Sequence, residues 1–167
     1  MGCDEVYENV GGYGVVGVIK GKKPGKVVAL RADMDALQIQ EMNEVPYKSK
    51  NDGVMHACGH DGHTAYLLIL AGILKGMQED IDGTIKFVHQ PAEETPPGGA
   101  KTIMESGILD DVDSIFGIHV MTTAPLGTVA YNSGVTQAGR PYRKVRINGQ
   151  RGPGSMPHPS NAPTVAA

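Results

Sequence analysis

The chain has 167 residues, of which 40% are apolar and 20% are charged, and its formal net charge is −3. This length suffices for one domain with a buried core, and the lack of a basic excess argues against binding to nucleic acid or to an anionic membrane surface. No apolar run reaches the roughly 18 residues of a transmembrane helix, and the first residues lack the pattern of a signal peptide. Two cysteines do not make a disulfide framework, so we expect a cytoplasmic protein.

The first part of the chain predicts two strands. Residues 6–12 are polar with glycines, and no strand is assigned to them. Residues 14–19 have the apolar character of a strand, and a Gly- and Pro-rich turn follows at 21–25. Residues 27–30 are a short continuous apolar run, which is typical of a strand buried on both faces. We expect the two strands to form a hairpin or meander.

Two carboxylates follow the second predicted strand. Asp33 and Asp35 lie just past its C-terminal end, where open α/β sheets place their active sites. A helix N-cap or a solvated turn would explain Asp35 equally well if it stood alone. Residues 38–54 are polar and are interrupted by Pro46, which predicts a loop leading into the next segment.

Residues 55–64 concentrate side chains that can bind metals, because they contain three of the six histidines and one of the two cysteines. Imidazole and thiolate suit Zn²⁺ and its transition-metal neighbours better than Mg²⁺ or Ca²⁺. Gly59 and Gly62 permit turns with positive φ that let neighbouring side chains converge. The alternative is a polar loop with solvated histidines, but Cys58 and His60 flanked by two further histidines favour a metal site.

A helix and a strand follow this segment. Residues 64–77 are apolar around most of the helical circumference, which predicts a well-buried helix. Residues 84–89 alternate as a strand does and lead to Glu93 and Glu94. One of these carboxylates can bind a metal while the other takes a proton from a water molecule. Taken alone, such a pair is more often a solvated turn.

The remaining elements are shorter. Residues 100–106 predict a short helix, and residues 112–120 predict a buried strand with His119 near its end. A single histidine there would usually be a core or rim residue, but this is the third strand end that carries a potential ligand. Residues 127–131 and 142–147 predict further strands.

This order of elements predicts an α/β fold with helices on the faces of a sheet. Because side chains at several strand ends can converge, we expect one site. Its expected metal ligands are Cys58, His60, Glu94 and His119, with Glu93 as general base. More than four ligands usually indicate two metals that share a water molecule.

Four segments in this order resemble the signatures of the M20 metallopeptidase family: residues 29–37, 56–63, 90–94 and 117–120. They are similar to its amidohydrolase branch, which contains N-acyl-amino-acid amidohydrolases, hippurate hydrolases and auxin-conjugate hydrolases. The resemblance implies an αβα three-layer catalytic domain, here over residues 1–139 and incomplete. It also implies the start of a smaller α+β lid or dimerisation domain over residues 140–167.

The resemblance implies hydrolysis of N-acyl amino acids or small peptides by metal-activated water. The ligand positions of the family fall on Cys58, His60, Glu94 and His119, the base on Glu93, and the acid that orients a ligand on Asp35. Two divalent ions are implied, with Zn²⁺, Mn²⁺, Co²⁺ and Ni²⁺ all open. We also expect a small-molecule substrate, a homo-oligomer, and neither a nucleic-acid nor a membrane partner.

The chain also departs from the family. Members are more than twice as long, and the chain has no counterpart of their last histidine ligand. Pro153 replaces a histidine that helps to hold the substrate's carbonyl oxygen, and proline has no side-chain donor. The alternative function is therefore a catalytically incompetent metal-binding fragment or pseudoenzyme that associates with another chain. A partial sheet would leave apolar edges uncovered, which predicts association.

Overall fold

The computed structural model describes residues 2–136, 146 and 148. The chain divides into two compact units, Met1–Thr128 and Val129–Ala167. The expected domain boundary near Arg140 lies outside the described residues and stays a prediction, as does most of the strand expected at 142–147. The strand expected at 127–131 is wrong: these residues form a turn and irregular backbone.

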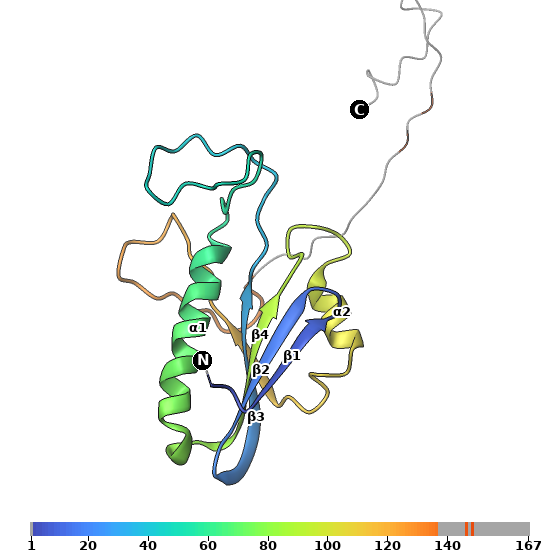
Figure 1. The fold of residues 1–167 in the computed structure, drawn as a ribbon, viewed down its shortest axis with the longest axis vertical. Coiled ribbons are helices and arrows are strands. Elements are labelled where there is room, and N and C mark those ends of the chain that lie inside the picture. Colours follow the sequence, from blue (N-terminus) through green and yellow to red (C-terminus); the bar gives the residue numbers. More distant parts are fainter. Residues whose placement is uncertain (1, 137–145, 147, 149–167) are drawn as a thin grey trace, which may run out of the picture. The chain divides into compact units, whose positions relative to one another are not determined.

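One five-stranded sheet, in the order β1-β2-β4-β3-β5, forms the centre of the first unit (Figure 1). β2 lies antiparallel to both β1 and β4, whereas β3 lies parallel to both β4 and β5. The elements in chain order are β1 Glu5–Val10, β2 Gly14–Lys20, β3 Lys23–Asp33, α1 His60–Gly76, a 3₁₀ turn Gln78–Asp80, β4 Asp82–Gln90, α2 Gly99–Glu105 and β5 Ser114–Gly117.

The expected hairpin of the two first predicted strands is wrong, although both strands exist. β4 lies between β2 and β3, and β2 instead forms its hairpin with β1. The connection from β2 to β3 passes close to the start of β4, where the Gly21 amide donates to the Gly83 carbonyl over 2.8 Å. A Cβ at Gly21 would lie only 2.0 Å from the Ile81 oxygen, so this close backbone approach requires glycine.

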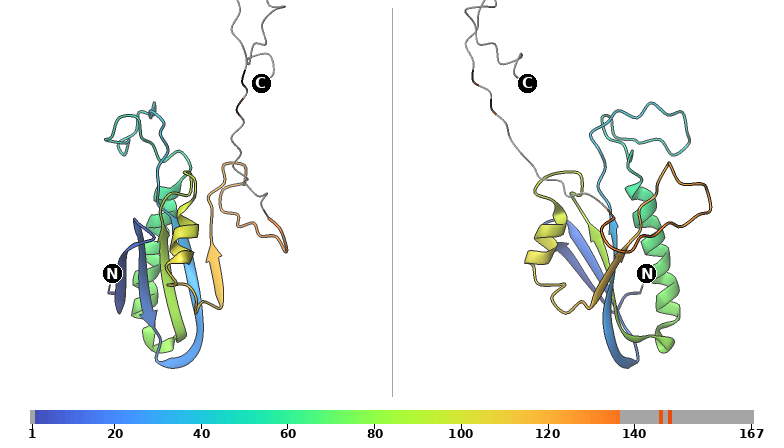
Figure 2. Two further views of the ribbon diagram at one scale, coloured as in Figure 1. Left: turned by 90° about the vertical axis from the view of Figure 1, so that its right-hand side faces the viewer. Right: turned by 180° about the vertical axis from the view of Figure 1, so that it is seen from behind.

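The sheet carries one helix on each face, which confirms the expected layered α/β fold (Figure 2). Alternate strand residues face opposite sides, so two separate cores form. The core under α1 contains Ile19, Ala32, Leu67, Ala71 and Phe87. The core under α2 contains Val10, Val16, Val18, Ala29, Val88 and Ile103. In the described part of the chain, no helix combines the length and apolarity needed to cross a membrane.

Helix α1 begins at His60, four residues before the predicted start. Gly59 precedes it with φ of 85°, a left-handed conformation that glycine adopts without steric cost. The earlier start places His60 and His63 on the first turn of a rigid helix rather than in a loop. Residues 38–54 form the expected loop, which an isolated bridge between Leu37 and Met55 closes at its base.

Strand β5 is shorter than predicted, and the expectation that it is buried is wrong. All four of its residues are exposed, including Ile115 at 54% and Phe116 at 61%. It pairs with β3 on one side, and among the described residues it has no strand partner on the other. His119 therefore lies in the segment that follows the strand.

Candidate metal centre

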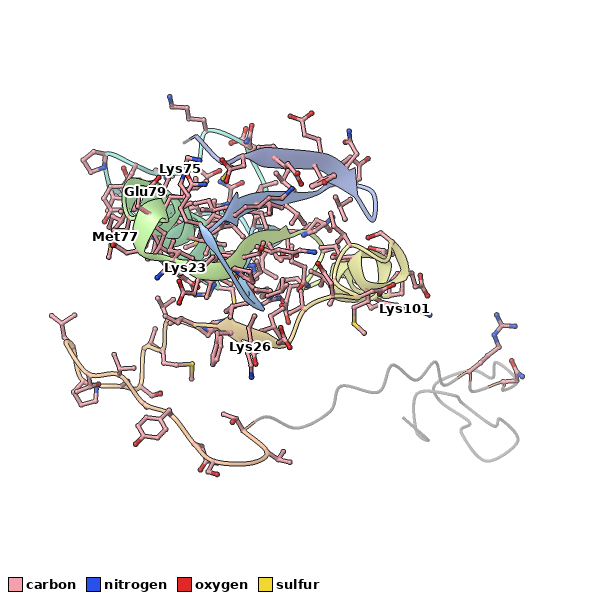
Figure 3. The ribbon with its side chains drawn as sticks, turned by 90° about the horizontal axis from the view of Figure 1, so that it is seen from below. Lys23, Lys26, Lys75, Met77, Glu79 and Lys101 are labelled. Atoms are coloured by element: carbon pink, nitrogen blue, oxygen red, sulfur yellow. The ribbon has the colours of Figure 1, made fainter. Side chains whose placement is uncertain are left out.

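Three parallel strands bring distant segments to one edge of the sheet. Asp33, at the end of β3, is in register with Gln90 at the end of β4, and Arg31 is in register with Gly117 of β5. The segments that follow these strands therefore emerge beside the first turn of α1. The opposite end of the sheet, seen in Figure 3, carries exposed charged side chains, including those of Lys23 and Glu79.

Among the described residues, three groups of potential metal ligands share His60. They are Cys58–His60–His119, His60–Glu93–Glu94 and Asp33–His60–His63, and within each group the ligand atoms lie within 4.8 Å of one another. The structure thus brings together all four expected ligands and the expected base. The Cys58 Sγ is 3.5 Å from the His119 Nε2, and the His60 Nε2 is 3.9 Å from the Glu94 Oε1.

The His60 ring is fully buried, and one of its two nitrogens makes a hydrogen bond. Its Nδ1 lies 2.9 Å from the backbone oxygen of Asp35, and because a carbonyl oxygen only accepts, Nδ1 carries the proton. In the neutral ring the lone pair then lies on Nε2, which has no hydrogen-bond partner among the described residues. An unpartnered buried polar atom costs roughly 1–3 kcal/mol, and a cation at this position would satisfy it.

Asp35 connects the end of β3 with the segment after β4. Its Oδ2 accepts a hydrogen bond from the Glu94 amide over 3.0 Å. Its Oδ1 is buried and, within the described part of the chain, lacks a hydrogen-bond partner. This carboxylate oxygen lies 3.3 Å from the His60 Nδ1, and a nearby cation would satisfy it as well. Asp35 thus contacts two expected ligands, as the orienting acid would.

His119 and Cys58 face each other across the group. The His119 Nδ1 donates to the carbonyl of Val120 over 2.6 Å, which leaves the Nε2 lone pair toward Cys58. Histidine ligands commonly donate their other ring nitrogen to a carbonyl in this way. Burial, with Glu94 adding to it, raises the pKa of the Cys58 thiol to about 11. A metal that binds here must therefore displace the thiol proton.

The sequence indicated Asp33 and His63 as possible site residues without a specific role for either, and both are nearly or fully buried in the site. The His63 Nδ1 lies 2.5 Å from the Asp33 Oδ1, and Arg31 contacts the other oxygen of Asp33 over 2.7 Å. Burial would raise the pKa of Asp33, but the His63 bond and the Arg31 charge outweigh it and hold the pKa below its usual value. The three-residue spacing from His60 would have placed His63 on the same face, had the helix start been known.

The donor set is two imidazole nitrogens, one thiol and two carboxylates. This combination suits a borderline divalent cation such as Zn²⁺ better than Mg²⁺ or Ca²⁺. Together with the parallel strand ends, it defines an α/β protein with a candidate metal centre at the sheet edge.

The chain belongs to the peptidase family M20/M25/M40, whose family model matches residues 29–167. It is 49% identical to a putative amidohydrolase, YhaA, of Bacillus subtilis over 92% of this chain and 39% of that protein. It is 44% identical to an N-acyl-L-amino acid amidohydrolase of Geobacillus stearothermophilus over 92% of this chain and 44% of that protein. The chain therefore spans less than half the length of these relatives.

A solved structure shows the same fold. The YXEP protein of Bacillus subtilis, described as a dinuclear metal binding peptidase from the M20 family, matches with a TM-score of 0.73 and 44% identity. The match covers 78% of this chain and 36% of that one. The family and the α/β architecture expected from the sequence are thus confirmed.

Proposed function

We propose that this chain provides the metal-binding part of a hydrolase that cleaves the amide bond of N-acyl amino acids or small peptides. The observation that carries the proposal is the buried, unpartnered Nε2 of His60 at the junction of the three ligand groups. The amidohydrolase names of two relatives support the substrate class.

The centre would hold two divalent ions, by analogy with the YXEP protein, which is described as dinuclear. Their ligands in this chain would be Cys58, His60, Glu94 and His119. Divalent ions polarise the substrate's carbonyl oxygen and lower the pKa of a water molecule toward neutrality. Zn²⁺, Mn²⁺, Co²⁺ and Ni²⁺ all suit this donor set.

Glu93 would move the proton. Its carboxylate lies with that of Glu94 beside His60, and adjacent residues direct their side chains differently, so the two can divide the work. Glu93 would accept a proton from the attacking water and donate it to the leaving amine. Asp35 would position the site by holding the Glu94 amide and by fixing the His60 ring through its backbone carbonyl.

The remaining proposals concern the setting of the protein. We infer a small-molecule substrate, and no nucleic-acid or membrane partner, from the substrate class and the net charge of −3. A cytoplasmic location fits the two free cysteines, and a homo-oligomer fits the family's dimerisation domain.

Metal content and turnover test the proposal in two steps. Plasma mass spectrometry of the purified protein should find about two metals per chain, and fewer in Cys58→Ala. Hydrolysis of a panel of N-acetyl amino acids should be abolished in Glu93→Gln while metal content stays unchanged. Metal binding without turnover in the unmodified chain would support the alternative of a metal-binding chain that lacks activity. Absence of metal would overturn the proposed site.

A further inference from the structure

A continuous series of hydrogen bonds leads from the sheet core to His119. The Arg31 guanidinium bonds the buried carboxylate of Asp33, and Asp33 bonds the Nδ1 of His63. The Nε2 of His63 accepts from the backbone amide of Val120 over 2.9 Å, and the Val120 carbonyl accepts from His119. The series thus joins β3, α1 and the segment after β5.

The bonding pattern fixes the protonation of His63. Because the Val120 N–H can only donate, the Nε2 of His63 must accept and therefore carries no proton. The single ring proton of the neutral form then lies on Nδ1, where it donates to Asp33 over 2.5 Å. Both ring nitrogens are used, so His63 is not a metal ligand despite its place beside His60.

Val120 also contacts the ligand segment through its side chain. A Cβ at Gly59 would lie 2.4 Å from the Val120 Cγ2, so this methyl group sits directly against the Gly59 backbone. Gly59 stands between Cys58 and His60 in the sequence. One residue therefore bonds His63 through its amide, holds His119 through its carbonyl and packs against the ligand segment through its side chain.

Apart from the Cys58 thiol and the edge of the buried His60 ring, little in the described structure restrains the His119 ring. It belongs to an exposed segment that follows an exposed strand. The His63 ring lies against it edge-on, with a centroid separation of 4.6 Å and an interplanar angle of 69°. His63 is fully buried and anchored on α1, so it can restrain a neighbour that the surface does not.

We propose that His63 is a positioning residue that holds His119 in place for metal binding, acting through the backbone of Val120. The inference rests on the proposed function where it concerns the metal. Its geometric part states that His63 restrains the segment around Val120. This restraint can be measured without any metal.

Amide hydrogen exchange tests the geometric part in the metal-free protein. The Val120 amide should exchange slowly in the natural chain and at least about tenfold faster in His63→Met, which has no nitrogen acceptor. His63→Gln has the same length and an amide oxygen that can accept, so protection should be partly retained. Equal Val120 exchange in the natural chain and His63→Met would overturn the proposal.

Zinc affinity, measured by competition with a chromophoric chelator, tests the consequence for the metal. We expect a loss of about 10–100-fold in His63→Met, as is typical of groups that orient a ligand. The loss should be smaller in His63→Gln and absent in His56→Gln, an exposed histidine of the same segment. Circular dichroism of the metal-free variants confirms that each is folded.

A double-mutant cycle separates positioning from general stability. If His63 acts through His119, then His63→Met should cost no further affinity in a His119→Ala background. Fully additive losses would overturn the proposal. If the natural chain binds no zinc, the proposed function fails, while the exchange of Val120 still decides whether His63 restrains this segment.

Discussion

The metal centre and strand β5 both adjoin strand β3, but the two regions differ sharply in how far their residues are exposed to solvent. At the centre, Asp33, His60 and His63 are at most 1% exposed, and each is hydrogen-bonded to a residue from another segment of the chain. In β5, Ile115 and Phe116 are more than half exposed. His119 belongs to the centre by its contacts and to the β5 region by its place in the chain. One expected ligand of the centre therefore comes from the more solvent-exposed of the two regions.

The two phenylalanines of the chain offer the sharpest test of this difference. Phe87 on β4 is 1% exposed and packs under α1, whereas Phe116 on β5 is 61% exposed. Phe87→Ala should lower the free energy of unfolding by about 3–5 kcal/mol, and Phe116→Ala by less than about 1 kcal/mol. Urea denaturation measures both. Equal losses would show that β5 is covered in solution.

His60→Ala should have the next largest effect, because both groups that contain the expected ligands, Cys58–His60–His119 and His60–Glu93–Glu94, share this residue. We expect zinc affinity to fall by at least about 100-fold, a loss beyond the 10–100-fold typical of supporting residues. Chelator competition measures it, and His56→Ala is the matched control. An unchanged affinity would remove His60 from the centre of the site.

The buried His89 should make the stability of the protein sensitive to acid. Burial lowers the pKa of His89, which is 7% exposed on β4. The unfolded chain therefore takes up the proton first, and stability should fall as the pH drops below about 6.5, by at most about 1.4 kcal/mol per pH unit. Unfolding of the natural chain and of His89→Gln between pH 7.5 and 5 should show a smaller decline in the variant. Parallel curves would contradict this.

The exposed edge should produce the mildest effect, a tendency to self-associate. β5 presents apolar side chains and, in the described part of the chain, an unpaired edge, a combination that promotes association. Phe116→Lys should lower the sedimentation-average mass at high protein concentration without changing the circular dichroism spectrum. Met104→Lys changes the charge by the same amount at an exposed residue of α2 and controls for the added charge.

Local patterns predicted the elements well where local forces decide them. The alternation at 84–89 and the apolar run at 27–30 correspond to β4 and β3. The expected ligands lie together because parallel strands direct their carboxyl ends to one edge. These features depend on periodicity and on residue chemistry, which a single sequence displays.

Features that depend on distant neighbours could not be predicted in this way. The strand order placed β4 between β2 and β3, and no local pattern in residues 14–30 indicates this. Likewise, the apolar character of β5 does not reveal whether another element covers it. The role of His63 was not predicted, because Gly59 and Gly62 indicated turns and the helix was therefore expected to begin only at residue 64.

The pairing of β3 with β5 has a consequence for the order of events during synthesis. Val27 donates its amide to the carboxylate of Asp113, 86 residues further along the chain. Contacts between such distant residues form late, because the intervening chain must first be made and its closure entropy overcome. A nascent chain can thus form the β1–β2 hairpin well before His119 has left the ribosome. Binding of a metal by all four expected ligands would then follow the formation of this hairpin.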